Sequence, residues 1–128
     1  MSILNPKQFE DYKELFENPE EGLKACLLVF VNDRITRVSG SLIRKLLNDF
    51  DMMSANENRQ TKIFYPIISE DADSNNLIKK LWQEFNDQRL IPFFVFTDLQ
   101  GFETGISEAG MTTADILLEK LRLIVPNP

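Results

Sequence analysis

The sequence predicts an α/β fold in three layers, with a central mixed sheet of four to five strands flanked by helices. One observation is a continuous apolar run over residues 93–96, which is typical of a strand covered on both faces. Asp98 and Gly101 then supply turn residues before a second strand over residues 102–106, so a hairpin is predicted. A second apolar run spans residues 27–31, and segments with helical spacing of apolar residues supply the covering layers.

The composition is that of an ordinary globular protein with a single domain over residues 1–128. Hydrophobic residues make up 43% of the 128 positions and charged residues 27%. The net charge of −6 argues against a nucleic-acid or anionic-membrane partner, because phosphate binding requires clustered lysine and arginine. No apolar run reaches the length of a bilayer span, and Pro6, Lys7 and Glu10 interrupt any leader-like segment. A cytoplasmic location is therefore expected.

Two features of the composition exclude whole classes of chemistry. Cys26 is the only cysteine, and the chain contains no histidine. An intrachain disulfide, Ser-His and Cys-His catalysis and the usual zinc sites are therefore excluded, and neither a metal nor a cofactor is expected. Cys26 itself has apolar neighbours, so we expect it to be buried, with a raised pKa and little reactivity.

The N-terminal segment is predicted to contain an edge strand and a helix. Residues 2–4 have strand character, Asn5 is placed to cap a helix and Pro6 to begin it. The acidic residues 17–22 are expected to form a solvated loop. The apolar face of the helix would consist of Phe9, Tyr12, Leu15 and Phe16.

A loop and then a second helix are predicted after the first central strand. Residues 32–40 are polar and are expected to form the loop, with Ser39 or Ser41 as the N-cap of a helix over residues 41–50. Residues 51–61 are again polar and are expected to form another loop. The predicted buried face of the helix consists of Leu42, Ile43, Leu46, Leu47 and Phe50.

The middle of the chain is predicted to contain one more strand and one more helix. The strand would span residues 62–68, but Pro66 lacks an N–H and implies a bulge or a poorly covered edge there. The carboxylates within residues 70–73 fit helix capping better than a calcium loop, because Asn76 and Trp82 occupy the positions of the required glycine and glutamate. The apolar face of this helix would consist of Leu77, Ile78, Leu81, Trp82 and Phe85.

A final amphipathic helix is predicted over residues 113–123. Thr112 and Asp115 approximate a capping box, and Met111 is spaced from Ile116 as in a hydrophobic staple. Pro126 would end the helix. Its predicted buried stripe consists of Ile116, Leu117, Leu121 and Ile124.

The order of these elements resembles the thioredoxin-like superfamily over nearly the whole chain. In that family an Ile-Pro or Thr-Pro pair, with a cis proline, precedes an apolar strand, a turn, a second strand, a glycine and a final helix. Ile91, Pro92 and Gly110 stand in the corresponding places here. Residues 27–31 resemble the first central strand, residues 41–50 the active-site helix, and residues 62–68 the next parallel strand. The resemblance implies a thioredoxin-like fold.

The redox motif of that family is missing. The resemblance places Thr36 and Ser39 roughly where the two cysteines of Cys-x-x-Cys would stand, and hydroxyl groups cannot perform thiolate exchange. The buried acid that the family carries on the preceding strand is absent as well. The chain therefore resembles a degenerate, non-redox member, which is expected not to be an enzyme and to lack thiol-disulfide oxidoreductase activity.

The resemblance implies a protein-binding, adaptor or chaperone-like role with another protein as partner. Members of this fold bind extended peptides through the backbone of the residue before the cis proline, which is Ile91 here. Cysteine-less thioredoxin-like chaperones, including those that assist hydrogenase maturation, have a similar arrangement. An exposed apolar patch on this surface would be unfavourable if nothing covered it. The predicted binding residues are Ile35, Thr36, Arg37, Val38, Ser39, Ile91 and Pro92.

Two alternatives remain open from the sequence. The chain could instead be a small-anion or small-ligand binding protein, or an enzyme without redox chemistry, that uses the same cleft. Arg34 or Arg37 near a helix N-terminus would then hold the anion, and Thr36 or Ser39 would contribute hydroxyls. That hypothesis lacks an activated nucleophile or base. A flavodoxin-like domain would be supported by a glycine-rich loop after the first central strand, but residues 32–39 contain no glycine.

Overall fold

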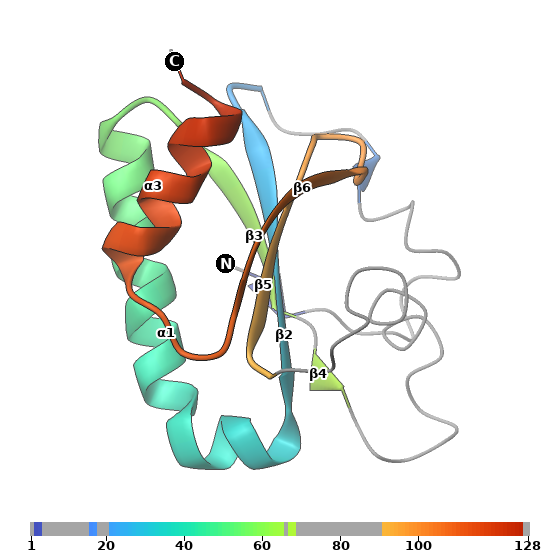
Figure 1. The fold of residues 1–128 in the computed structure, drawn as a ribbon, viewed down its shortest axis with the longest axis vertical. Helices are drawn as coiled ribbons and strands as arrows, with labels where there is room; N and C mark the ends of the chain where they lie inside the picture. Colours follow the sequence, from blue (N-terminus) through green and yellow to red (C-terminus); the bar gives the residue numbers. More distant parts are fainter. Residues whose placement is uncertain (1, 4–15, 18–20, 66, 69–90, 127–128) are drawn as a thin grey trace.

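Strand β2 (Ala25–Asn32) is the centre of the sheet in the computed structural model, which describes residues 2–3, 16–17, 21–65, 67–68 and 91–126. It pairs in parallel with β3 (Thr61–Tyr65) and antiparallel with β5 (Phe93–Thr97) (Figure 1). All residues of β2 before Asn32 are buried, and so are all residues of β5. The continuous apolar runs were therefore correctly interpreted as strands covered on both faces.

Three further strands complete the described sheet. β1 (Ser2–Ile3) pairs in parallel with β3 at one edge, and β6 (Glu103–Ala109) pairs antiparallel with β5 at the other, giving the order β1-β3-β2-β5-β6. β4 (Ile67–Ile68) pairs in parallel with the last two residues of β2. The single strand predicted over residues 62–68 is thus two strands, β3 and β4, and Pro66 between them lies outside the described residues.

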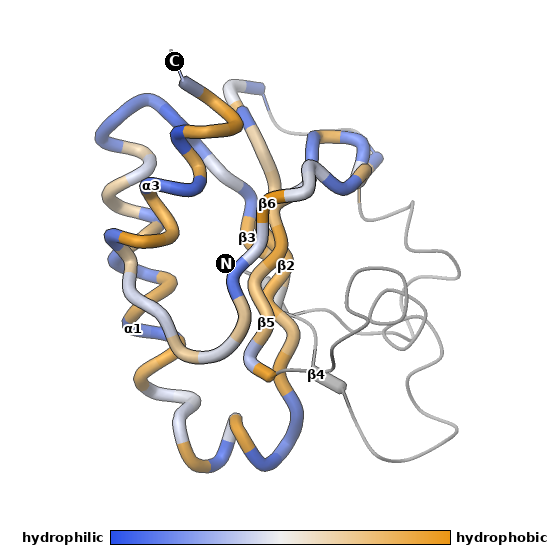
Figure 2. The backbone as a smooth tube through the Cα atoms, viewed as in Figure 1, coloured by the Kyte–Doolittle hydropathy of each residue, from blue (hydrophilic) through white to orange (hydrophobic). Residues whose placement is uncertain are grey.

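Helices α1 (Asp33–Asn56) and α3 (Ala114–Ile124) lie side by side on one face of the sheet (Figure 1). The central strands β2 and β5 are predominantly apolar, whereas the two helices alternate apolar and polar residues (Figure 2). The apolar side of each helix packs against the sheet to form the larger core. Its fully buried members include Leu27, Val29, Ile43, Leu47, Phe50, Phe94, Phe96, Leu117 and Leu121.

The opposite face of the sheet carries a second apolar cluster. Strand residues pointing to that face are buried, and Phe16 contacts Phe64 edge-on with ring centroids 5.4 Å apart. The helices predicted around residues 6–16 and 77–85, and the acidic residues 70–73, lie outside the described residues apart from Phe16. The other buried members of the cluster are Cys26, Leu28, Phe30, Phe93 and Val95.

The described elements form an α/β fold of thioredoxin-like arrangement. A parallel β2-α1-β3 unit is followed by the antiparallel hairpin of β5 and β6 and then by α3, as the resemblance implied. The peptide bond between Ile91 and Pro92 is cis. Neither described helix combines the length and apolar character that a membrane crossing would need.

The start of α1 differs from the prediction. Residues 32–40 are not a loop, because α1 begins at Asp33, directly after β2, and neither Ser39 nor Ser41 is its N-cap. The cap is Asn32, whose Oδ1 accepts a hydrogen bond from the backbone N–H of Ile35 at 2.8 Å. A polar segment that contains its own cap can therefore start a helix without a connecting loop.

The end of α1 and one side of its face also differ from the prediction. The helix continues through residues 51–56, which were expected to be loop, and ends at Asn56. Leu42 was predicted to be buried but is 62% exposed, because it lies one helical step outside the stripe that faces the sheet. That stripe consists of Ile43, Leu46, Leu47, Phe50 and Ser54.

The final helix also begins differently. Its N-cap is Thr113 rather than Thr112, and Thr113 Oγ1 accepts from the backbone N–H of Ile116 at 3.2 Å. Ile116 is exposed rather than buried, whereas Leu117, Leu118 and Leu121 are buried. The one-residue shift of the cap removes the staple spacing that the sequence suggested.

Gly40→Ala is expected to stabilise the protein by about 1 kcal/mol, because glycine in a helix interior is unfavourable by about that amount relative to alanine. An added Cβ would lie 3.6 Å from Thr36 Cγ2, an ordinary van der Waals contact. Urea denaturation measures the change. Gly22→Ala is the control, since Gly22 has open space but a φ of +92°, and the same substitution there should destabilise. A destabilised Gly40→Ala variant would contradict this account.

Candidate functional site at the start of helix α1

The start of α1 and the Ile91-Pro92 segment lie at the same end of the sheet. The antiparallel register of β2 and β5 ends with Phe30 opposite Phe93. Residues 91–92 therefore enter the sheet beside the last residues of β2, where α1 begins. Pro92 is buried, and Ile91 is half-buried. The two parts of the predicted binding surface are thus brought to one end of the fold.

The first turn of α1 satisfies much of its own hydrogen-bonding capacity. Asn32 caps the backbone N–H of Ile35, and Thr36 Oγ1 donates to the backbone oxygen of Asn32 at 2.9 Å. Asp33 adds a negative charge in the first turn. That charge complements the helix dipole and opposes a bound anion, despite the exposed Arg34 and Arg37 nearby.

The three apolar residues of the predicted patch have different surroundings. Val38 is 76% exposed, whereas Ile35 and Ile91 are half-buried. Ile35 packs against the core beneath α1 and α3, and Ile91 packs against the cluster on the opposite face of the sheet. Ser39 is half-buried on α1. Val38 is therefore the strongly exposed apolar residue of this surface.

The backbone of Ile91 is open within the part of the chain that the structure describes. No described residue forms a hydrogen bond with its N–H or C=O. The neighbouring Pro92 oxygen, by contrast, accepts from the backbone N–H of Gly110 at 2.8 Å. Pro92 is therefore anchored to the end of the hairpin, whereas the backbone groups of Ile91 have no partner among the described residues.

Cys26 lies far from this surface and is buried, as predicted. Cys26 is 3% exposed, and on β2 it lies opposite Thr97 of the neighbouring strand β5. Burial is the main cause that raises the pKa of its thiol to about 11. It precedes Asn32 by six strand residues, a distance of about 20 Å at the usual rise of a strand. The thiol cannot take part in chemistry at the start of α1.

We expect Cys26 to react slowly with iodoacetamide in the folded protein. Burial of the thiol raises its pKa from 9.0 to about 11. At about pH 8 this shift lowers the thiolate fraction roughly a hundredfold. Mass spectrometry should find little alkylation in buffer and complete alkylation in urea. Equal rates in both conditions would show that the thiol is accessible.

The same shift makes the contribution of Cys26 to stability depend on pH. The folded thiol keeps its proton up to a pKa of about 11, whereas the unfolded thiol loses it near 9.0. The contribution of Cys26 to stability is therefore complete below the unfolded-state pKa of 9.0, and it is lost as pH rises toward the folded-state pKa of about 11. Between about pH 8 and about pH 10.5, the free energy of unfolding should fall less in Cys26→Ala than in wild type. Parallel urea denaturation series measure this difference.

One surface feature was not predicted from the sequence. A groove runs between α1 and the start of α3 and is lined by Leu42, Met52 and Met53 among others. The signal for it was present in the spacing of residues along α1, but Leu42 was assigned to the core and residues 51–56 to a loop. No group of three or more potential metal-binding side chains occurs among the described residues.

Similar folds occur among solved protein structures. No protein-family model and no curated protein matches the sequence. The exposed lipoprotein thioredoxin of Streptococcus pneumoniae is 15% identical, with a TM-score of 0.48, over 78% of this chain and 84% of that chain. A similarity of this size carries no information about function.

Proposed function

We propose that this chain is a non-catalytic thioredoxin-fold protein that binds another protein. The binding surface comprises the residue before Pro92 and the first two turns of α1. The observation that carries this proposal is the backbone of Ile91 beside the end of β2, with which no described residue pairs. An N–H and a C=O that no described residue uses are suited to pair with an extended peptide.

The side chains around Ile91 would provide contacts beyond backbone pairing. Val38 offers an exposed apolar contact, and Arg34 and Arg37 offer charged donors from the same turns. Backbone pairing contributes affinity in this mode of recognition, whereas the neighbouring side chains contribute specificity. An extended segment with an apolar residue and a carboxylate is therefore the ligand that these groups fit.

The proposal includes the absence of thiol-disulfide oxidoreductase activity. Such catalysis needs an accessible thiolate, and the only cysteine is buried with its pKa raised to about 11. A dithiol-driven insulin reduction assay should show no turnover above the rate of the dithiol alone. Measurable turnover that disappears in Cys26→Ala would contradict this part of the proposal.

Affinity capture with a matched pair of variants tests the binding surface. Wild type, Ile91→Asp and Leu123→Asp are immobilised, and proteins retained from the native cell are identified by mass spectrometry. Leu123 is an exposed apolar residue on α3, so its variant makes the same chemical change away from the proposed surface. Circular dichroism checks that all three proteins are folded.

The expected result is a partner retained by wild type and Leu123→Asp and lost by Ile91→Asp. Titration of the purified partner by calorimetry should then show at least about a tenfold weaker affinity for Ile91→Asp. Equal affinity of both variants for that partner would refute the proposed surface.

A further inference from the structure

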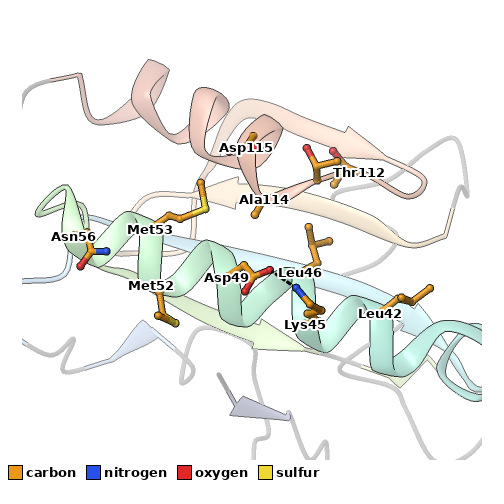
Figure 3. A pocket seen from close by; sticks show the side chains of 11 residues that line it. Leu42, Lys45, Leu46, Asp49, Met52, Met53, Asn56, Thr112, Ala114 and Asp115 are labelled. Atoms are coloured by element: carbon orange, nitrogen blue, oxygen red, sulfur yellow. Dashed lines mark hydrogen bonds and ion pairs between the residues drawn. The ribbon is translucent and has the colours of Figure 1, made fainter.

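A groove between α1 and α3 is a concave feature in the described part of the chain. Its volume is about 510 Å³ at the start of α3, and it continues into a second hollow of about 450 Å³ toward the other end of the two helices. Leu46 and Met53 point from α1 toward α3, with Ala114 and Thr112 opposite them (Figure 3). The two hollows share Met53, Asn56 and Asp115.

One row of residues along α1 forms the outer wall of the groove. Its members alternate spacings of four and three residues, which places them on a single side of the helix. Leu42 and Met52 are 62% and 66% exposed. Lys45 and Asp49, between the apolar members, bond to each other at 3.0 Å. The row consists of Leu42, Lys45, Asp49, Met52 and Asn56.

The shape and the side chains of the groove suit an α-helix. From Leu42 to Asn56 the wall is about 21 Å long at the rise of an α-helix, which matches about four turns of a docked helix. Amphipathic helices fill such grooves with apolar anchors at helical spacing. Met52 and Met53 are unbranched and adapt to the shape of an inserted side chain.

The charges that line the groove indicate the charge of the helix it fits. Lys45 is bonded to Asp49, and Arg122 is bonded to Glu57. No described residue lies within ion-pair distance of Asp115 or Glu119, which line the α3 side, although both interact electrostatically with Arg122. Two carboxylates thus remain beside an apolar floor. Lysine or arginine flanking the apolar face of a partner helix would complement them.

We infer that the groove between α1 and α3 binds an amphipathic, basic α-helix of a partner protein. A second copy of this chain is disfavoured as the occupant, because the chain carries a net charge of −6 and the groove has unpaired carboxylates. The exposed apolar residues of the groove wall are buried by the helix, and Asp115 and Glu119 contact its basic side chains. This surface is separate from the backbone of Ile91.

A designed peptide is the probe for this inference. It is a fluorescein-labelled helix of about 16 residues, with leucines at i, i+3, i+4 and i+7 spacing and lysines on the flanks. One control peptide has the same composition in an order that lacks helical periodicity, and another has glutamate in place of lysine. Fluorescence anisotropy at about 0.15 M salt measures binding, and amide chemical-shift mapping locates it.

The wild-type protein should bind the periodic lysine peptide at least about tenfold more tightly than either control peptide. Leu42→Asn and Met52→Asn should each weaken that binding about tenfold, whereas Leu123→Asn, an exposed position outside the groove, should not. Asp115→Asn with Glu119→Gln should reduce both the affinity and its salt dependence. Shifted amide signals should map to α1 and α3.

Several results would overturn the inference. Equal binding of all three peptides, or unchanged binding by Leu42→Asn and Met52→Asn, would show that the groove does not recognise the helix. Sedimentation that detects a dimer dissociated by Met52→Asn would assign the groove to a second copy of the chain. Ile91→Asp should leave peptide binding unchanged, so the result is independent of the proposed function.

Discussion

Gly101→Ala is expected to lower the free energy of unfolding by about 2–4 kcal/mol, since it combines backbone strain with a steric clash. Gly101 lies in the turn between β5 and β6 at a φ of +91°. A Cβ at this position would lie 2.5 Å from Cδ2 of Phe16. Phe16 is buried against Phe64, so its ring has little room to move away.

The turn itself resists the backbone change that would relieve the strain. Asp98 Oδ1 accepts from the backbone N–H groups of Gln100 and Phe102, each at 2.9 Å. The backbone N–H of Gly101 donates to the oxygen of Asp98 at 3.2 Å. These bonds hold the residue at positive φ, which L-residues other than asparagine and aspartate rarely adopt.

Gly105→Ala separates the two causes. Gly105 also has a positive φ, +82°, but a Cβ there would have nothing within 4 Å. Its substitution should lower the free energy of unfolding by about 1–2 kcal/mol, the backbone contribution alone. Urea denaturation of both variants measures the difference. An equal loss in the two variants would show that Phe16 does not contribute to the effect of Gly101→Ala.

The sheet was predictable from the sequence because its strands are covered on both faces. Runs such as residues 27–31 and 93–96 contain no polar position, and few other structures accommodate such runs at that length. The bounds of α1 were not predictable in the same way. Its first turns are polar and include Gly40, and its N-cap Asn32 belongs to the strand before it. Local polarity therefore indicated a loop where capping and packing produce a helix.

The candidate site was predictable in part for a related reason. The burial of Cys26 follows from its apolar neighbours, and the structure confirms it. The exposure of Leu42 follows from its place one helical step outside the stripe of α1 that faces the sheet, and the sequence did not show which apolar positions at the margin of that stripe would be covered. The role of Ile91 and its neighbours in binding stays a prediction. Long-range packing decides these features, whereas periodicity decides only which side of an element is apolar.

Arg59→Ala is also expected to lower the free energy of unfolding by about 2–4 kcal/mol, because it removes a buried side chain and leaves three part-buried acceptors without donors. Arg59 is buried in the connection between α1 and β3. Its Nε donates to the backbone oxygen of Val125 at 2.5 Å, and its Nη2 donates to that of Pro126 at 2.6 Å. The Nη1 atom donates to Glu57 Oε1 at 2.6 Å.

These bonds connect the end of α1 to the end of α3. Val125 is the C-cap of α3, and carbonyl groups at a helix C-terminus have no partners within the helix. The guanidinium supplies those partners, and its positive charge also complements the helix dipole. Arg59 thus holds the C-terminal ends of α1 and α3 together, and an apolar residue at this position could not supply its hydrogen-bond donors.

Two variants separate the geometry of the side chain from its charge. Arg59→Lys keeps the charge but cannot donate to three acceptors in the same planar arrangement, so it should recover only part of the loss. Arg122→Ala removes an exposed arginine that bonds the same carboxylate, Glu57, and should have a much smaller effect than Arg59→Ala. Thermal and urea denaturation measure the order of stability of the three variants. Equal stability of Arg59→Ala and Arg122→Ala would show that the bonds to Val125 and Pro126 contribute little, and that packing of the α3 leucines alone holds that helix on the sheet.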